Sequence, residues 1–164
     1  MRSLLAFVAV VITGAALMPT PAPAATTPGF DLVIAVRSIE TASIPSDKAP
    51  TGPSKGDRFL LRDNLVNIAG QFGKKAGVVV GVDAGILTLT SKTEGTVVGY
   101  AALPGGRIRF HGVLHLTGRN APFKIDGGTG RYTHAQGILA VGPGDNPLNV
   151  YHVRFPAKNG SPVV

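Results

Sequence analysis

The chain has 164 residues, a formal net charge of +7 and no cysteine, and 44% of its residues are hydrophobic while 15% are charged. This length allows one domain of ordinary size, and the apolar content argues against a disordered chain. The absence of cysteine excludes a disulfide scaffold, a thiolate zinc site and a cysteine nucleophile. The 22 glycines and 13 prolines are too many for a helical bundle.

The N-terminal segment has the three parts of a secretory signal. Arg2 precedes the apolar run Leu4–Met18, and Ala22-Pro23-Ala24 has the small-x-small form of a cleavage site. The apolar run is shorter than the roughly 20 residues of a membrane-spanning helix. We therefore expect residues 1–24 to be a signal peptide and residues 25–164 to form one secreted domain, without stable membrane insertion after cleavage. A retained N-terminal anchor is the alternative.

Apolar and polar residues alternate with a period of two along much of the remaining chain, which predicts strands. In chain order these strands are residues 29–39, 58–66, 76–90, 96–103, 107–117, 123–126, one within 132–141, and 149–155. A loop is predicted for residues 43–56 and a turn for the glycine run 127–130. Eight short strands and no helix indicate an antiparallel barrel or sandwich, and the glycines inside strands favour a barrel.

One of these strands carries a carboxylate on its apolar face. Strand alternation places Asp63 on the side of Phe59, Leu61 and Leu65. If this face lines the barrel, desolvation raises the pKa of the Asp63 carboxyl, which can then act as a general acid or base. The alternative is a residue at a strand end, where Asp63-Asn64 begins a turn.

Two further polar residues are candidates for the same cavity. Asp83 lies between Gly81 and Gly85 and is either a second polar anchor or a bulge residue that binds backbone amides. Tyr100 is flanked by small residues. Its hydroxyl either orients a ligand or donates a proton, or the side chain takes part in ordinary barrel packing. The predicted ligand-binding wall consists of Phe59, Leu61, Phe110 and Tyr151.

Basic side chains are predicted on the outer faces of the same strands, as at Arg58, Arg62, Arg107 and Arg109. This band is either a solvated surface or a site for acidic glycans or another anionic partner. It lacks the interleaved aromatic residues of a groove that binds single-stranded nucleic acid, so we do not expect a nucleic acid partner.

The pair His111/His115 is four residues apart on a strand. Their Cα atoms are therefore roughly 13 Å apart, which is too far for the two side chains to share one ion. No metal site is predicted.

Several segments resemble a known family in their order and spacing. They are Gly56–Leu65, Lys75–Gly85, and Gly106–Gly112 followed by Phe123–Tyr132. Together they resemble the plant dirigent proteins and allene oxide cyclases over about residues 30–155. The resemblance implies an eight-stranded antiparallel closed barrel of calycin type, an apolar cavity, a frequent homotrimer and no metal or organic cofactor. Such cyclases close an oxylipin epoxide, whereas dirigents steer the coupling of phenoxy radicals made by a separate oxidase.

The sequence therefore predicts a secreted, cofactor-free all-β barrel that binds a small apolar or phenolic ligand and steers its cyclisation or coupling. Asp63, Asp83 and Tyr100 are the catalytic candidates. The expected partners are the ligand, an oxidase, and further copies in a homotrimer or homodimer. One alternative is a non-catalytic basic module that binds through its outer surface. Another is an isomerase without the cyclase cysteine, at whose position this chain has Leu87.

Overall fold

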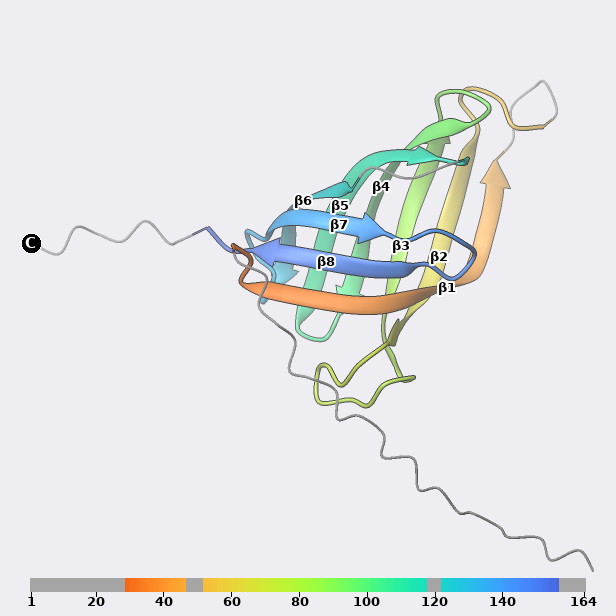
Figure 1. Cartoon of the computed structure of the whole chain (residues 1–164). Helices are drawn as coiled ribbons and strands as arrows, with labels where there is room; N and C mark the ends of the chain where they lie inside the picture. Colours follow the sequence, from red (N-terminus) through yellow and green to blue (C-terminus); the bar gives the residue numbers. More distant parts are fainter. Residues whose placement is uncertain (1–28, 47–51, 118–121, 157–164) are drawn as a thin grey trace, which may run out of the picture.

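The computed structural model describes residues 29–46, 52–117 and 122–156. They form a closed antiparallel barrel in which each strand pairs with its neighbours in the chain and β8 returns to β1 (Figure 1). The strands are β1 (Leu32–Ser46), β2 (Arg58–Asn67), β3 (Val79–Leu89), β4 (Glu94–Leu103), β5 (Gly106–His115), β6 (Phe123–Gly130), β7 (Gln136–Val141) and β8 (Leu148–Arg154). The predicted all-β, eight-stranded antiparallel closed barrel is confirmed.

The segment predicted to be a signal peptide, residues 1–24, lies outside the described residues. Across residues 29–46, 52–117 and 122–156, no helix is long and apolar enough to span a membrane.

The first strand is longer than its sequence suggested. The predicted loop over residues 43–56 is wrong at its start, because β1 continues to Ser46 in register with β2. Pro45 lies opposite Phe59 in this extension. The pairing of β1 with β8 covers only Leu32 to Arg37, so the far part of β1 pairs with β2 alone. A proline is tolerated there because its missing N–H need not serve a second neighbour.

The predicted turn at residues 127–130 is also wrong, because these glycines form the end of β6 and the turn follows them. Gly128 lies against the backbone carbonyls of Arg107 and Tyr132, where a Cβ atom would clash with both. The run therefore provides close backbone approach rather than a chain reversal. Tyr132 is completely buried, and its hydroxyl donates a hydrogen bond to the Pro104 carbonyl at 3.1 Å.

One half of the barrel interior is packed with apolar side chains, and the other half contains a cavity. Inward-facing residues near the start of β1 and the end of β2 belong to the packed half, for example Ile34, Val36 and Leu65, which are at most 1% exposed. Towards the other end of β2, the inward-facing Asp63 and Leu61 line the cavity instead. The barrel is therefore neither plugged solid nor hollow throughout.

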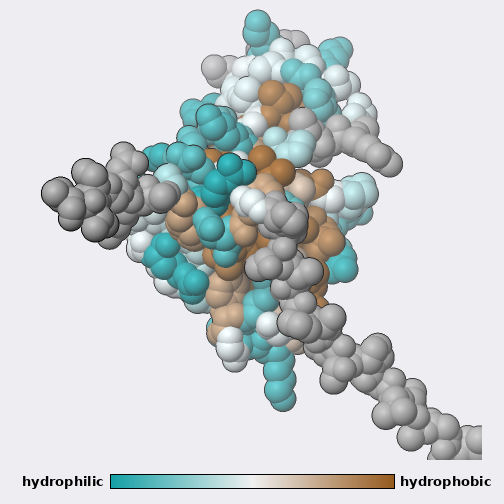
Figure 2. All heavy atoms as spheres, turned by 60° about the vertical axis from the view of Figure 1, so that its left-hand side comes forward, coloured by the Kyte–Doolittle hydropathy of each residue, from teal (hydrophilic) through white to brown (hydrophobic). Residues whose placement is uncertain are grey.

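The outer surface mixes basic and apolar side chains. Arg58, Arg62, Arg107 and Arg109 are exposed, as predicted for the outer faces. Figure 2 shows one side of the molecule, on which apolar side chains reach the surface among polar ones. The strand register also aligns exposed apolar residues of β1 to β4 in one cross-strand row, which consists of Ile44, Leu60, Ile86 and Val98. We call this set the apolar row.

Candidate functional site

The cavity occupies about 150 Å³ inside the barrel and is lined mostly by apolar side chains. Its wall includes Leu61, Val97 and Leu139, together with Phe110 and Phe123. The two phenyl rings are stacked, with centroids 6.1 Å apart and an interplanar angle of 17°. An apolar cavity with a few convergent polar groups is the usual form of a small-molecule site.

A pair of carboxyl groups forms the polar part of this wall. Asp63 of β2 and Asp83 of β3 are direct partners in the antiparallel register, and both line the cavity. Side chains at directly opposed positions have Cβ atoms about 5 Å apart. From β1, the Ser38 Oγ donates a hydrogen bond of 2.7 Å to Asp63 Oδ2. Three adjacent strands thus bring one hydroxyl and two carboxyl groups to the same place.

Asp63 is not a turn residue and Asp83 is not a bulge residue, which were the alternative interpretations of these two positions. Asp63 does not begin a turn, since β2 continues to Asn67. Asp83 is in regular register with Asp63 and with Ala101, and the irregularity of β3 lies before Gly81. Both side chains line the cavity, which for Asp63 is the inward position that strand alternation predicted.

The environment changes the proton affinity of one carboxyl strongly. Burial raises the pKa of Asp83 from its ordinary value of 3.8 to about 7, and the charge of Asp63 adds to the increase. The nearby Ser38 hydroxyl opposes this increase. At neutral pH the Asp83 carboxyl is therefore about half protonated, the condition in which a side chain can both donate and accept a proton.

Two buried polar residues of β8 belong to the same region. Asn149 is 4% exposed and lines the cavity, and its Oδ1 has no hydrogen-bond partner among the described residues. The hydroxyl of the fully buried Tyr151 likewise has none within the described ranges. Burial raises the pKa of Tyr151 well above its ordinary value, and the charges of Asp83 and Asp63 raise it further. The Tyr151 hydroxyl consequently stays protonated at neutral pH.

The predicted wall residues divide into two groups. Leu61 and Phe110 line the cavity itself. Tyr151 is completely buried beside it, and Phe59 is half-buried against the apolar core. All four side chains thus contribute to the barrel interior, and their part in ligand binding stays a prediction.

Tyr100 is not brought to this site. It is 36% exposed on the outer face of β4, and the guanidinium carbon of Arg107 lies 4.7 Å from its ring centroid. The inward position beside it belongs to Ala101, which is completely buried. The expectation that the Tyr100 hydroxyl reaches the cavity is therefore not met, because alternation turns its side chain outward.

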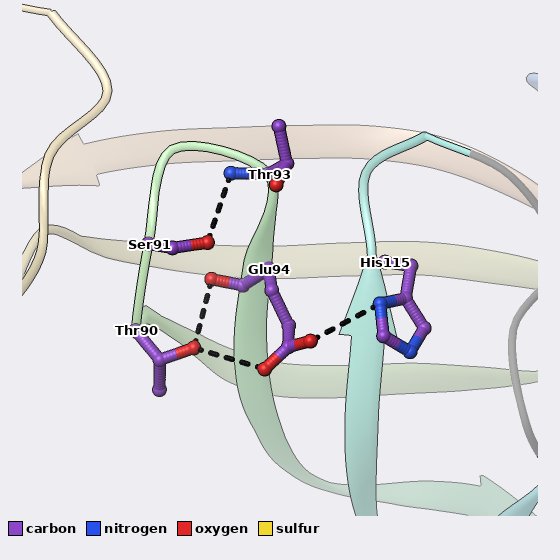
Figure 3. A network of polar contacts seen from close by, with 5 residues as sticks. All are labelled: Thr90, Ser91, Thr93, Glu94 and His115. Atoms are coloured by element: carbon purple, nitrogen blue, oxygen red, sulfur yellow. Dashed lines mark hydrogen bonds and ion pairs between the residues drawn. The ribbon is translucent and has the colours of Figure 1, made fainter.

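The histidines of β5 lie on the outer surface, and each contacts a different acidic side chain. His115 Nδ1 is 3.3 Å from Glu94 Oε2, and Thr90 Oγ1 also contacts this glutamate (Figure 3). His111 Nδ1 is 3.2 Å from Asp126 Oδ2. No group of three or more potential metal-ligating acidic, histidine or cysteine side chains occurs within the described part of the chain. The two histidines thus lie on the polar outer face of β5.

Comparison with known proteins identifies the fold. No protein-family model matches the chain, and none of the curated proteins compared with it matches. Among solved structures, pyocyanin demethylase is similar, with a TM-score of 0.61 and 20% sequence identity over 74% of this chain and 99% of that chain. This similarity shows a shared barrel fold. It does not distinguish the dirigent and allene oxide cyclase family, so the narrower resemblance stays a prediction.

Proposed function

We propose that this barrel binds a small, largely apolar molecule in its cavity and exchanges a proton with it through Asp63 and Asp83. The observation that carries the proposal is the carboxyl pair in an apolar cavity, where Asp83 has a pKa of about 7. A carboxyl group with a pKa near ambient pH is well suited to general acid–base catalysis. The cavity walls would hold one conformer of the ligand and so lower the entropic part of the barrier.

The resemblance to dirigents and allene oxide cyclases extends this proposal to a reaction class. We infer that the bound molecule is guided through cyclisation or coupling, without a metal or organic cofactor and, for coupling, with radicals supplied by an oxidase. The name of the structural neighbour, pyocyanin demethylase, supports action on a small molecule. Export through residues 1–24 belongs to the same proposal and would place this activity outside the cell.

Phenol is a suitable probe of the cavity because it combines one apolar ring with one hydroxyl. A cavity of about 150 Å³ accommodates a benzene-sized ring. We expect Val97→Phe to abolish phenol binding measured by calorimetry, because this side chain lines the cavity. The matched control is Val113→Phe, since Val113 is 39% exposed on the outer face of β5 and lies outside the apolar row. Equal phenol affinity in both variants, with folding checked by NMR, would refute the proposed cavity site.

We also propose that the apolar row mediates self-association. Its four side chains are between 37% and 65% exposed and lie on adjacent strands. Contiguous apolar side chains on a sheet exterior are typical of an interface, and the family resemblance favours further copies of this chain as the partner.

Leu60→Glu tests this interface by placing a charge within the apolar row. Sedimentation velocity should show an oligomer for the unmodified protein and a monomer for Leu60→Glu, because an unpaired charge is costly to bury. Ile138→Glu on β7, at 37% exposure, is the control outside the row and should leave the oligomer intact. A monomeric unmodified protein at about 100 µM would contradict self-association.

A further inference from the structure

The cavity wall carries acidic groups without basic ones. Asp63 and Asp83 face each other across the β2–β3 pair, and none of the described residues that line the cavity is lysine, arginine or histidine. Two ionised carboxylates on directly opposed residues of neighbouring strands repel each other, and a cation between them removes that repulsion. The electrostatics of this cavity wall are therefore those of a cation-binding site.

A second and independent observation points to a ligand with hydrogen-bond donors. Asn149, from β8, lines the same cavity at 4% exposure, and its Oδ1 accepts no hydrogen bond from any described residue. A buried carbonyl oxygen without a donor costs free energy, which a bound N–H group would recover. Ser38 cannot supply this donor, because its hydroxyl already donates to Asp63.

The apolar part of the wall indicates what kind of cation fits. The stacked rings of Phe110 and Phe123 line the cavity, and aromatic faces attract organic cations. The volume of about 150 Å³ is close to the size of a cavity that holds one benzene ring. The remaining wall is mostly aliphatic, which favours a ligand with an apolar body over a fully hydrated ion.

We propose that the cavity binds a small organic cation, namely a one-ring compound that carries an ammonium or amidinium group. The N–H groups of the ligand contact the carboxylates of Asp63 and Asp83, and its ring lies against the phenyl groups. This inference rests on the proposed function and specifies its ligand: a protonated nitrogen base is the molecule with which the carboxyl pair exchanges a proton.

Binding of such a cation is coupled to pH through the carboxyl pair. The titratable groups facing Asp83 are Asp63 from β2 and Tyr151 from β8, and the neutral polar groups are Ser38 and Asn149. The cation requires the ionised form of Asp83, whose pKa without ligand is about 7. The affinity for an ammonium ligand should therefore be constant between about pH 8 and pH 9, where the ligand keeps its charge, and fall about tenfold for each pH unit between about 7 and 5.

Three probes of matched shape test the charge preference: benzylammonium, benzyl alcohol and benzoate. Calorimetry on the full chain at pH 8 should give benzylammonium an affinity at least about tenfold higher than benzyl alcohol, with no detectable benzoate binding. At pH 7, binding of benzylammonium should release about half a proton, measured from the dependence of the enthalpy on buffer. Equal affinities for benzylammonium and benzyl alcohol would overturn the inference.

Two conservative variants assign the preference to the carboxyl pair. Asp63→Asn and Asp83→Asn should each lower benzylammonium affinity at least about tenfold while changing benzyl alcohol affinity little. Asp126→Asn is the matched control, because this acid pairs with Arg109 and His111 on the outer surface. Unchanged benzylammonium affinity in both cavity variants would overturn the inference, as would tighter binding of Ca²⁺ than of benzylammonium.

Comparing phenol binding with benzylammonium binding distinguishes a failure of this inference from a failure of the proposed function. If phenol binds in the cavity and Val97→Phe prevents it, while benzylammonium shows no advantage, the cavity site stands and the cationic ligand is wrong. If neither phenol nor benzylammonium binds, both are wrong.

Discussion

Lowering the pH from 8 to 5 should make the ligand-free protein more resistant to urea, because its buried carboxyl is then protonated. The pKa of Asp83 is about 7 in the folded protein and 3.8 in the unfolded chain, so the folded state binds more protons between these values. The contribution of Asp83 to stability is therefore greatest below about pH 4, decreases from there to pH 7, and is constant above pH 7. The full difference is at most roughly 4 kcal/mol.

Asp83→Asn isolates this contribution from those of other titrating groups. Between pH 5 and pH 8, the free energy of unfolding of this variant should decrease much less than that of the unmodified protein. At pH 8 the variant should be more stable than the unmodified protein by up to a few kcal/mol. Asp126→Asn, on the outer surface, should keep the unmodified pH profile. Parallel stability curves for the unmodified protein and Asp83→Asn would show that the carboxyl is not buried as described.

Gly128→Ala should destabilise the barrel by about 3 kcal/mol or more, measured by urea denaturation. The added Cβ atom would clash with two backbone carbonyl oxygens, those of Arg107 and Tyr132. A backbone contact cannot be relieved by a rotamer change, so either β6 must move away from β5 or the turn after it must open. The expected loss is therefore large for a single methyl group.

The control for this substitution is Gly70→Ala. Gly70 has no positive φ, and the nearest atom to an added Cβ would be the Lys74 carbonyl oxygen at 3.9 Å, an ordinary contact. Its substitution should change stability by less than about 0.5 kcal/mol. If Gly128→Ala were as well tolerated as Gly70→Ala, the close packing of β6 against the following turn would be wrong.

The architecture could be predicted because period-two alternation is a local signal. In β2 it correctly turned Phe59, Leu61 and Asp63 to the inside. It failed at the glycine run 127–130, since glycines that permit close backbone approach look the same in sequence as glycines that permit a turn. The extension of β1 past Ile39 was missed because this segment contains proline and serine, which are ordinarily loop residues. The strand continues there because it pairs with β2, and this pairing is not visible in the local sequence.

The site was only partly predictable, because it depends on which strands pair and in which register. Alternation after Ile34 and Val36 places Ser38 on the inner face, but nothing in its neighbourhood indicates contact with an acid 25 residues later. Asn149 could have been found in the same way from the inward position of Tyr151. At Tyr100 the signal was absent, because its small neighbours give no contrast between the two faces.

The most direct test of the central claim is a ¹³C NMR titration of the aspartate side-chain carboxyls in the ligand-free protein. One resonance, assigned through its loss in Asp83→Asn, should titrate with a pKa of about 7. In Asp63→Asn the same resonance should titrate at a lower pH, because the neighbouring charge has been removed. Titration of every aspartate carboxyl between about pH 3 and 5 would contradict a buried carboxyl pair inside the barrel.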